Sequence, residues 1–390
     1  MTARWRVAAI VGGAAVLAAG CGSTPARTPT QTAAPAAAMV SLSLSTSAAA
    51  ADGTWAAIPM GGTGPNLFWQ LLRLPAAGGR WSLRTPPDIA TNGALILAPQ
   101  DGTGRDARTL ITGIRPSLYL SYSPVTTTAD GGTAWSTLPP DPSLADVPDS
   151  LAAAPDGHLI ALGPGPRAAQ RISVLRPGGS GWTTLAGPPP GSRACDPTAL
   201  TAVAYDQDGT PLLGGNCAQP GVAGIFAYAA GTWQLAGPAW PASYGRQRIQ
   251  VLRLTRTGAT DTALVEAGTG HAASLVAAWT GDNGQHWTLS PALRLAGARP
   301  VSASVGDGGT IAVTLSGDRG ETLDRSGTSW QPLPALPDGR AVTLAPLAAG
   351  TTDALVADGS TLTVWRHAAG SAGWARAQAI QVPIQYGSSS

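Results

Sequence analysis

The side chains best suited to chemistry in this chain of 390 residues are carboxylates. The chain holds 20 aspartates and only two glutamates, Glu266 and Glu321. Two carboxyl groups at a fixed separation, one an acid and the other a base or nucleophile, are what most glycoside hydrolases require. Many of the aspartates stand directly before glycine, however, and an Asp-Gly pair is typical of a turn that the aspartate side chain itself holds together. We therefore expect structural roles for these carboxylates and predict no catalytic residue.

The other polar residues do not predict metal or cofactor chemistry. The histidines lack the H-x-H or H-x-x-x-H spacing that places two imidazoles on one metal ion. They are His158, His271, His286 and His367. The glycine-rich pieces 163–165 and 178–181 do not precede a helix, so they do not form a phosphate cradle. Asp141, Asp146 and Asp149 are interpreted as a solvated acidic loop. We predict no metal and no cofactor.

The first residues have the layout of a secretory signal, with Arg4 and Arg6, an apolar run over residues 7–20, and then Cys21. The run is too short for a membrane-spanning helix, which needs about 20 residues. Its end, Leu17-Ala18-Ala19-Gly20-Cys21, resembles a bacterial lipobox, whose cysteine becomes the lipidated first residue of the mature protein. The resemblance implies a signal peptide over 1–20 and a lipid on Cys21 that anchors the exported protein at the outer face of the cytoplasmic membrane. An ordinary cleaved signal with an accidental Cys21 is the alternative.

Residues 21–38 are rich in Ala, Pro and Thr and carry one charge, Arg27. Such a segment cannot bury enough apolar surface to offset its chain entropy, so we expect a disordered tether. We assign the folded domain to residues 39–386 and a frayed tail to residues 387–390.

The two remaining cysteines, Cys195 and Cys217, are an even pair in a chain predicted to be exported. Outside the cytoplasm such a pair is most simply a disulfide. The segment between them predicts two strands around a turn at residues 206–209, and that hairpin would bring the cysteines nearly opposite each other. With no histidine nearby, they do not predict a metal site.

The elements that position these residues are organised around two copies of one turn. The pattern S/T-x-D-x-G-x-x-W occurs at residues 128–135 and again at 280–287. The aspartate accepts hydrogen bonds from its own turn, the glycine takes a positive φ, and the tryptophan opens the outgoing strand and buries apolar area. These residues are Asp130, Gly132, Trp135, Asp282, Gly284 and Trp287. All three roles are structural.

This pattern resembles the Asp-box, or bacterial neuraminidase repeat, of β-propellers. The resemblance implies an all-β propeller and leaves function open, because it is shared by sialidases, photosystem assembly factors and sorting-receptor ectodomains. Sialidases carry an Arg-Ile-Pro signature, an arginine triad for the substrate carboxylate, and a Tyr nucleophile supported by a Glu. Here Ile114-Arg115-Pro116 has a scrambled order, Glu266 lies in an apolar strand context, and no Tyr–Glu pairing can be traced.

Tryptophans expected to open an outer strand recur with a period near 49 residues, which is typical of a propeller. They are Trp81, Trp135, Trp182, Trp233, Trp287, Trp330 and Trp374. Their number predicts a single propeller of about seven four-stranded blades, with six or eight as alternatives. The predicted blade limits are 40–85, 86–140, 141–188, 189–240, 241–292, 293–335 and 336–386.

Two further expectations concern how the ring closes and where the remaining tryptophans lie. The run Met39–Thr46 is expected to be able to pair with the last blade and latch the ring shut. Trp69, Trp240, Trp279 and Trp365 fall outside the repeat position; blade packing explains them best, and a carbohydrate or peptide surface is the alternative.

The net charge is only +2 and no basic cluster appears, so nucleic acid is not an expected partner. We predict a monomeric, membrane-anchored lipoprotein whose propeller binds a protein or glycan of the cell envelope without catalysis. A sialidase-like or other glycan-cleaving hydrolase is one alternative, and an assembly factor for an envelope complex is another. Arginines converging with acids at the channel mouth would favour the hydrolase.

Overall fold

The computed structural model describes residues 46–61, 67–86, 94–100, 108–114, 125–138, 149–164, 170–189, 194–326, 328–339 and 341–383. The chain divides into two compact units, Met1–Ala38 and Met39–Ser390, and every described residue belongs to the second. Within the described ranges there are strands, turns and short 3-10 segments but no α-helix. The 3-10 segments are Ala242–Tyr244, Gly270–Ala272, Asp307–Gly309 and Ala348–Gly350. No helical segment in this part of the chain is long and apolar enough to cross a membrane.

The described strands form seven consecutive antiparallel sets, which we number as blades 1 to 7. Blade 1 contains β1 (Thr46–Ala50), β2 (Gly53–Gly61), β3 (Leu67–Pro75) and β4 (Ser82–Leu83). Blade 2 contains β5 (Ala94–Gln100), β6 (Arg108–Ile114), β7 (Val125–Thr128) and β8 (Ser136–Thr137). Blade 3 contains β9 (Ser150–Ala153), β10 (Leu159–Pro164), β11 (Gln170–Leu175) and β12 (Thr183–Leu185). Blade 4 contains β13 (Pro197–Tyr205), β14 (Pro211–Cys217), β15 (Ala223–Ala229) and β16 (Thr232–Leu235).

Blade 5 contains β17 (Ile249–Thr257), β18 (Thr260–Ala267), β19 (Ser274–Thr280) and β20 (Thr288–Leu289), with β21 (Leu293–Arg294) also paired to β19. Blade 6 contains β22 (Pro300–Val305), β23 (Ile311–Leu315), β24 (Arg319–Leu323) and β25 (Gln331–Pro332). Blade 7 contains β26 (Ala341–Pro346), β27 (Thr352–Asp358), β28 (Thr361–His367) and β29 (Ala375–Gln381). Apart from β21, which lies just inside the predicted sixth unit, every strand falls within its predicted limits.

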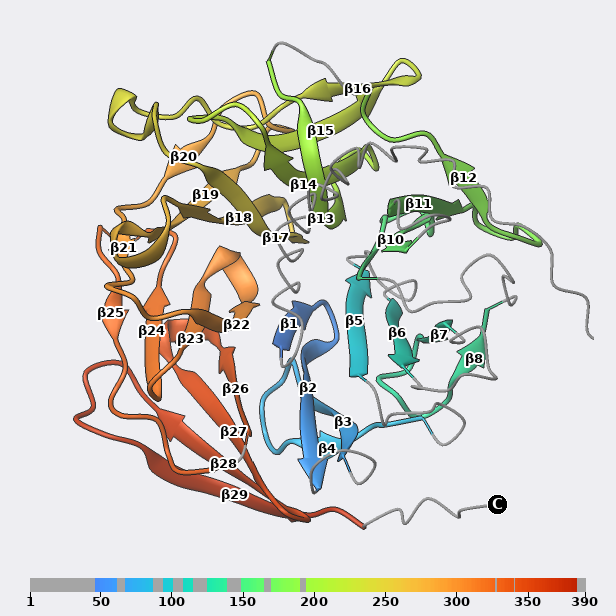
Figure 1. The fold of residues 1–390 in the computed structure, drawn as a ribbon. Helices are drawn as coiled ribbons and strands as arrows, with labels where there is room; N and C mark the ends of the chain where they lie inside the picture. The colour runs from blue at the N-terminus through green and yellow to red at the C-terminus, as the bar shows by residue number, and fades with distance from the viewer. Residues whose placement is uncertain are drawn as a thin grey trace, which may run out of the picture. The chain divides into compact units, whose positions relative to one another are not determined.

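The blades are arranged around a common centre, each with its first strand innermost (Figure 1). Each innermost strand contacts the innermost strand of the next blade, and β26 contacts β1, so the ring is closed. Single pairings also join blades into larger sheets. Asn216 of β14 pairs with Gln250 of β17 between neighbouring blades 4 and 5, and Ala48 of β1 pairs with Val305 of β22 between blades 1 and 6. The fold is therefore an all-β propeller, as predicted, and its described strands agree with about seven blades.

Both faces of the blades are buried, because side chains alternate between the two sides of a strand. In β5, Leu95 and Leu97 pack against blade 1, whereas Ile96 and Ala98 pack against blade 3. An apolar cluster lies in this way between every two neighbouring blades of the described chain. Each blade is thus held by an apolar core on either side, and the described residues form these seven separate clusters.

A tryptophan lies directly before the last strand of each blade, or at its second residue in the case of Trp233, at the seven predicted positions. Among the described residues, four of the indole N–H groups donate to a backbone carbonyl of the preceding blade. These are Trp233 to Ala186 at 2.7 Å, Trp287 to Ala236 at 2.8 Å, Trp330 to Pro291 at 3.0 Å and Trp374 to Pro334 at 3.3 Å. These four tryptophans therefore join blades 4 to 7 to the preceding blade as well as filling the gap between them.

The tryptophans outside the repeat position also pack within or between blades. Trp69 and Trp279 are buried, and Trp279 donates its indole N–H to the carbonyl of Gly309 in the next blade at 3.0 Å. Trp240 and Trp365 are partly buried against apolar clusters. The packing explanation given for these four residues therefore agrees with the structure.

The expected latch is not formed by the described part of Met39–Thr46. Thr46 belongs to β1, which pairs with β2 of its own blade and, in parallel, with β22 of blade 6. Ser47 fixes this position, because its N–H donates to Ser304 Oγ at 2.9 Å and its hydroxyl to the carbonyl of Leu344 at 2.9 Å. The innermost strand of blade 1 therefore lies against blades 6 and 7 instead of adding a strand to the last blade. Residues 39–45 lie outside the described ranges.

Candidate functional site

The two Asp-Gly-Trp turns (residues 128–135 and 280–287) use their carboxylates internally. Asp130 Oδ1 accepts the Thr128 hydroxyl at 2.8 Å and the N–H groups of Thr133 and Ala134 at 3.0 and 2.9 Å. These hydrogen bonds, with that from Ala134 the strongest, lower the pKa of Asp130. Gly132 has a φ of 82° there, a conformation that favours glycine.

The second turn repeats this geometry. Asp282 Oδ1 accepts the His286 N–H at 2.9 Å and the Thr280 hydroxyl at 2.7 Å, and Oδ2 lies 2.6 Å from His286 Nδ1. The hydrogen bond from the His286 backbone contributes most to lowering the pKa of Asp282 to about 2. Gly284 has a φ of 81°, and Trp287 packs in the cluster between blades 4 and 5. Neither aspartate has the raised pKa that a general acid needs at neutral pH.

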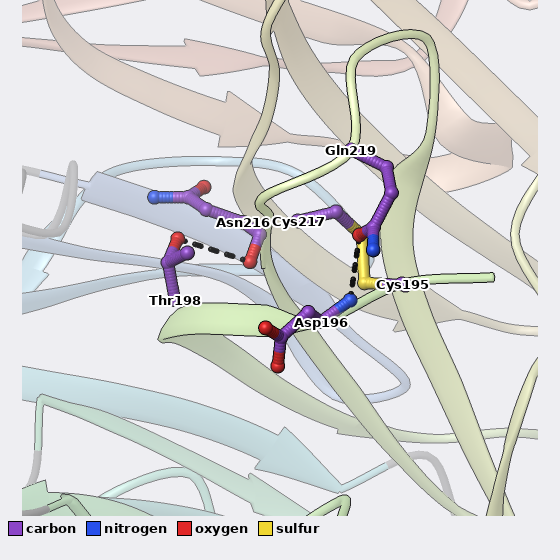
Figure 2. Close-up of a disulfide and its surroundings, with 6 residues drawn as sticks. All are labelled: Cys195, Asp196, Thr198, Asn216, Cys217 and Gln219. Carbon is purple, nitrogen blue, oxygen red and sulfur yellow. Dashed lines mark hydrogen bonds between the residues drawn. A yellow bond between two sulfur atoms is a disulfide. The ribbon is translucent and has the colours of Figure 1, made fainter. Parts of the chain in front are cut away.

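The cysteine pair forms a disulfide between Cys195 and Cys217, as predicted (Figure 2). The bond lies where β13 and β14 pair, with Pro197 opposite Cys217. The Gln219 side chain accepts the Asp196 N–H at 2.7 Å beside it. Both cysteines are buried, so the bond is a structural clasp across the base of the hairpin rather than an exposed redox centre.

Replacing both cysteines by serine should lower the free energy of unfolding by about 3 kcal/mol, because the unfolded chain regains the freedom of a loop whose ends are 22 residues apart. The measurement is urea unfolding of wild type and the double variant. The fully reduced wild type serves as control, since it should match the variant. Equal stability of oxidised and reduced protein would contradict the prediction.

The main concave site near the centre is an axial cavity of about 80 Å³. Its walls come from β1, β5, β9, β13 and β17, the innermost strands of blades 1 to 5. Alanine, leucine and threonine side chains make up most of the lining. Its ionisable residues are Asp149, Tyr205, Arg253 and Arg256. We take this cavity as the first candidate site.

Arg253 connects three blades at this cavity. Its Nη1 donates to Thr46 Oγ1 at 2.7 Å and to the carbonyl of Ala303 at 3.0 Å. Its Nε is buried and has no hydrogen-bond partner among the described residues. Burial lowers the pKa of Arg253 to about 10, which leaves the guanidinium charged at neutral pH. No sequence signal pointed to this residue.

The other ionisable groups of the axial cavity do not form a hydrolase centre. Burial, followed by the charge of Asp156, raises the pKa of the Tyr205 phenol, the opposite of what an activated nucleophile requires. Arg256 donates to the carbonyls of Asp206 and Gly258 at 2.6 and 2.7 Å. Desolvation raises the pKa of Asp149, which also lines the cavity.

The two glutamates lie elsewhere. Glu266 is on β18 and Glu321 on β24, where Arg319 Nη2 lies 3.2 Å from Glu321 Oε1. Neither lines the axial cavity. No group of three or more His, Cys, Asp or Glu side chains in the described ranges could hold a metal ion. The structure therefore does not bring Tyr205 together with a glutamate.

Asp261, on β18, is a buried carboxyl near a second buried acid, Asp206. Its Oδ1 has no hydrogen-bond partner among the described residues. Burial, with a smaller contribution from the Asp206 charge, raises the pKa of Asp261 to about 7, and the Arg256 charge opposes this shift. The pair lies in the turn region between blades 4 and 5.

The pKa of Asp261 is higher in the folded protein than its unfolded value of about 3.9. The Asp261 carboxyl therefore makes its full contribution to the free energy of unfolding below pH 4, and this contribution should be lost as the pH rises through 7. The Asp261→Asn variant has no carboxyl group to titrate at this position, so it should lack this loss. The free energy of unfolding of the variant minus that of wild type should therefore be larger at pH 8 than at pH 4, by at most about 4 kcal/mol. Urea unfolding across pH 4–8 measures it. Asp358→Asn, at an exposed position, should retain the wild-type profile, and an unchanged profile for Asp261→Asn would refute the prediction.

The second candidate site is a groove of about 310 Å³ beside blades 6 and 7. Its apolar lining consists of Pro59, Val301, Leu315, Leu336, Ala341 and Val342. Val301 is 48% exposed and Leu235, far along the chain in blade 4, is 41% exposed; they are the exposed large hydrophobic residues of the described chain. Asp318 is the charged residue among the described groove residues. The groove was not predicted from the sequence, because its walls come from three separate blades.

Several predicted features lie outside the described residues and have no structural account. They are Cys21, the 1–20 signal peptide and the 21–38 tether, Asp141, Asp146, and the Arg115-Pro116 part of the scrambled signature. The histidines are described but scattered: His158 and His286 each pair with an aspartate of their own turn.

No protein-family model and no curated protein matches the sequence. Solved structures that are similar include a putative 6-phosphogluconolactonase from Bacteroides fragilis, with a TM-score of 0.48 and 10% identity over 84% of this chain and 95% of that chain. AofleA from Arthrobotrys oligospora has a TM-score of 0.47 and 12% identity over 76% and 88%. YCF48 from Cyanidioschyzon merolae has a TM-score of 0.45 and 14% identity over 83% and 95%. Such scores transfer neither a ligand nor an activity, and the propeller assignment rests on the strand topology of the chain itself.

Proposed function

We propose that this protein is an exported, lipid-anchored propeller that binds an envelope protein through the groove beside blades 6 and 7 and catalyses nothing. The observation that carries the proposal is the apolar groove with Val301 exposed at its wall. Its volume of about 310 Å³ is enough for one or two apolar side chains of a partner. Asp318 adds a negative charge beside it, which favours a partner segment that carries an apolar anchor next to a basic residue.

A protein partner is favoured over a glycan by the aromatic residues. Sugar rings are commonly bound on exposed aromatic faces, and no Trp, Tyr or Phe in the described ranges is exposed. The described tryptophans pack within or between blades instead. The assembly-factor alternative is one form of this proposal, in which the bound protein belongs to a larger envelope complex. The two Asp-Gly-Trp turns support placing the chain among Asp-box propellers.

A glycan-cleaving hydrolase is disfavoured by the axial cavity. A volume of about 80 Å³ does not hold a sugar ring, given that benzene occupies a cavity of roughly 150 Å³. The arginines in its wall are engaged by neighbouring backbone carbonyls, and Asp130 and Asp282 are each engaged within their own turn. Among the residues that the structure describes, no two carboxyl groups line the axial cavity together.

The test is a pull-down of the tagged, full-length protein from native envelope after mild cross-linking. Wild type should recover one envelope protein in stoichiometric amount, and Val301→Glu should recover at least tenfold less. Leu235→Glu is the matched control, because it places the same charge at the other exposed apolar residue and should behave as wild type. Equal recovery by all three proteins would exclude the groove as the binding surface. Recovery of glycan without protein would make the protein a sugar binder instead.

The anchor is a separate part of the proposal. Cys21→Ala should move the protein from the membrane fraction to the soluble fraction, because the lipid would have no attachment site. Cys195→Ser should stay with the membrane, which shows that the loss is specific to Cys21. Unchanged membrane retention of Cys21→Ala would refute lipid anchoring and leave the groove proposal untouched.

A further inference from the structure

The guanidinium of Arg253 is the feature of the described chain that the proposed function does not use. It lines the axial cavity, and its Nη1 is bonded to Thr46 Oγ1 and to the Ala303 carbonyl. Its Nε is buried without a partner, and no carboxylate of the described ranges forms an ion pair with Arg253. The residue as a whole is only half-buried, but its enclosed Nε–H has neither a hydrogen-bond partner nor a counter-charge, which is unfavourable and which a bound anion would correct.

The guanidinium keeps its charge in this position. Burial lowers the pKa of Arg253, but only to about 10, so the side chain is a cation at any physiological pH. A guanidinium presents several N–H donors in a fixed plane, which suits a carboxylate or another compact oxyanion. A neutral ligand would leave Arg253 without a counter-charge.

The size of the cavity limits the anion. About 80 Å³ is room for two or three waters, since each takes roughly 30 Å³ of the liquid. An acetate-sized group fits this space, whereas the roughly 150 Å³ that benzene occupies would not be available to a ring. Thr46, Thr201 and Thr255 also line the cavity, where the Thr46 and Thr201 hydroxyls donate to the carbonyls of Ala303 and Val251.

The other charged groups of the cavity decide where the anion lies. Arg256 is occupied by the carbonyls of Asp206 and Gly258, and Asp149 would repel an anion from the start of β9. Among the described residues that line the axial cavity, Arg253 Nε is therefore the buried donor that still lacks an acceptor.

We propose that the axial cavity binds one compact anion, a carboxylate-sized group that accepts a hydrogen bond from Arg253 Nε. The anion would complete the contacts by which Arg253 joins blades 1, 5 and 6. Two sources share this chemistry: a free small carboxylate, and the terminal carboxylate of a partner chain. The proposal is independent of the groove beside blades 6 and 7.

The experiment follows thermal unfolding in chloride-free sodium MES, whose sulfonate head is bulkier than a carboxylate, as sodium acetate replaces it at constant ionic strength. The Tm of wild type should rise saturably with acetate, because a ligand that binds only the folded state stabilises it. Arg253→Gln should bind acetate at least tenfold more weakly. Arg248→Gln, which removes an exposed arginine just before the same strand, should respond as wild type does.

A second measurement does not depend on how well the variant folds. Crystals of wild-type protein soaked in bromide should show an anomalous peak at hydrogen-bond distance from Arg253 Nε. No saturable acetate effect and no bromide peak would overturn the proposal and leave Arg253 as a structural link between blades. A saturable effect that Arg253→Gln retains in full would also overturn it.

Titration with N-acetylglycylglycine and with its C-terminal amide distinguishes a free small carboxylate from the terminal carboxylate of a partner chain. Binding of the peptide acid at least tenfold tighter than acetate, with no binding of the amide, assigns the site to a partner's terminal carboxylate. Binding of acetate alone assigns it to a free anion.

Discussion

Asp353→Ala should lower the free energy of unfolding by about 3 kcal/mol, because it removes a buried carboxylate that accepts three hydrogen bonds and leaves the buried Trp81 indole N–H without its acceptor. Asp353 is 0% exposed and lies on β27 in blade 7. It accepts Arg366 Nε and Nη2 at 2.7 and 2.8 Å, and the Trp81 indole N–H of blade 1 at 2.9 Å. The hydrogen bonds with Asp353 raise the pKa of Arg366. The Arg366 side chain is 39% exposed, so water would solvate its charge in the variant and the lost hydrogen bonds account for the effect.

The loss of stability in Asp353→Ala should affect the contact between two blades as well as blade 7 itself. It sits where the first and last blades meet, and the Gln378 side chain also joins them there by bonding the N–H and carbonyl of Trp81. Since the described strands contain no latch that adds β1 to blade 7, this seam depends on side chains and on the apolar cluster behind them.

Urea unfolding of three proteins tests this prediction. Asp353→Asn keeps an acceptor for Trp81 and should be affected less than Asp353→Ala. Asp358→Ala, at the exposed end of the same strand, should change stability by less than about 0.5 kcal/mol. A loss below about 1 kcal/mol for Asp353→Ala would mean that the seam is held by its apolar cluster alone.

Trp55→Ala should also cost about 3–5 kcal/mol, because it empties a large site in the packed cluster between blades 1 and 2. Trp55 is 0% exposed, and its indole N–H donates to Asp52 Oδ1 at 2.9 Å. Its ring meets that of Trp135 edge to face at 6.1 Å, and the Arg73 guanidinium lies 5.8 Å from its centre. Removing the ring would therefore also unpack both neighbours.

The comparison with Trp135→Ala tests the burial argument. Trp135 touches the same cluster but is only partly buried, so its loss should be smaller, about 1–2 kcal/mol. Thermal and urea unfolding of both variants measure the difference. An equal or larger loss for Trp135→Ala would show that the repeat tryptophan, rather than Trp55, carries the packing between these blades.

The sequence by itself determined the features that depend on neighbours along the chain. The Asp130 and Asp282 turns, the Cys195–Cys217 clasp and the strand-opening tryptophans each depend on contacts within one hairpin or one repeat. Side-chain acceptors, positive-φ glycines and the period near 49 residues are therefore visible in the order of the amino acids. The all-β class and the blade limits followed from them.

The tertiary structure decided what depends on ring closure. Arg253 meets Thr46 across 207 positions of sequence, and Asp353 meets Trp81 across 272. The raised pKa of Asp261 and the groove at Val301 likewise need two or three blades in place. Nothing in the local pattern distinguishes Arg253 from an exposed arginine in a strand, because its environment is created by β1 from the other end of the chain. Local chemistry specified the blades, and only the closed ring specified which buried charges and which apolar surface remain available for binding.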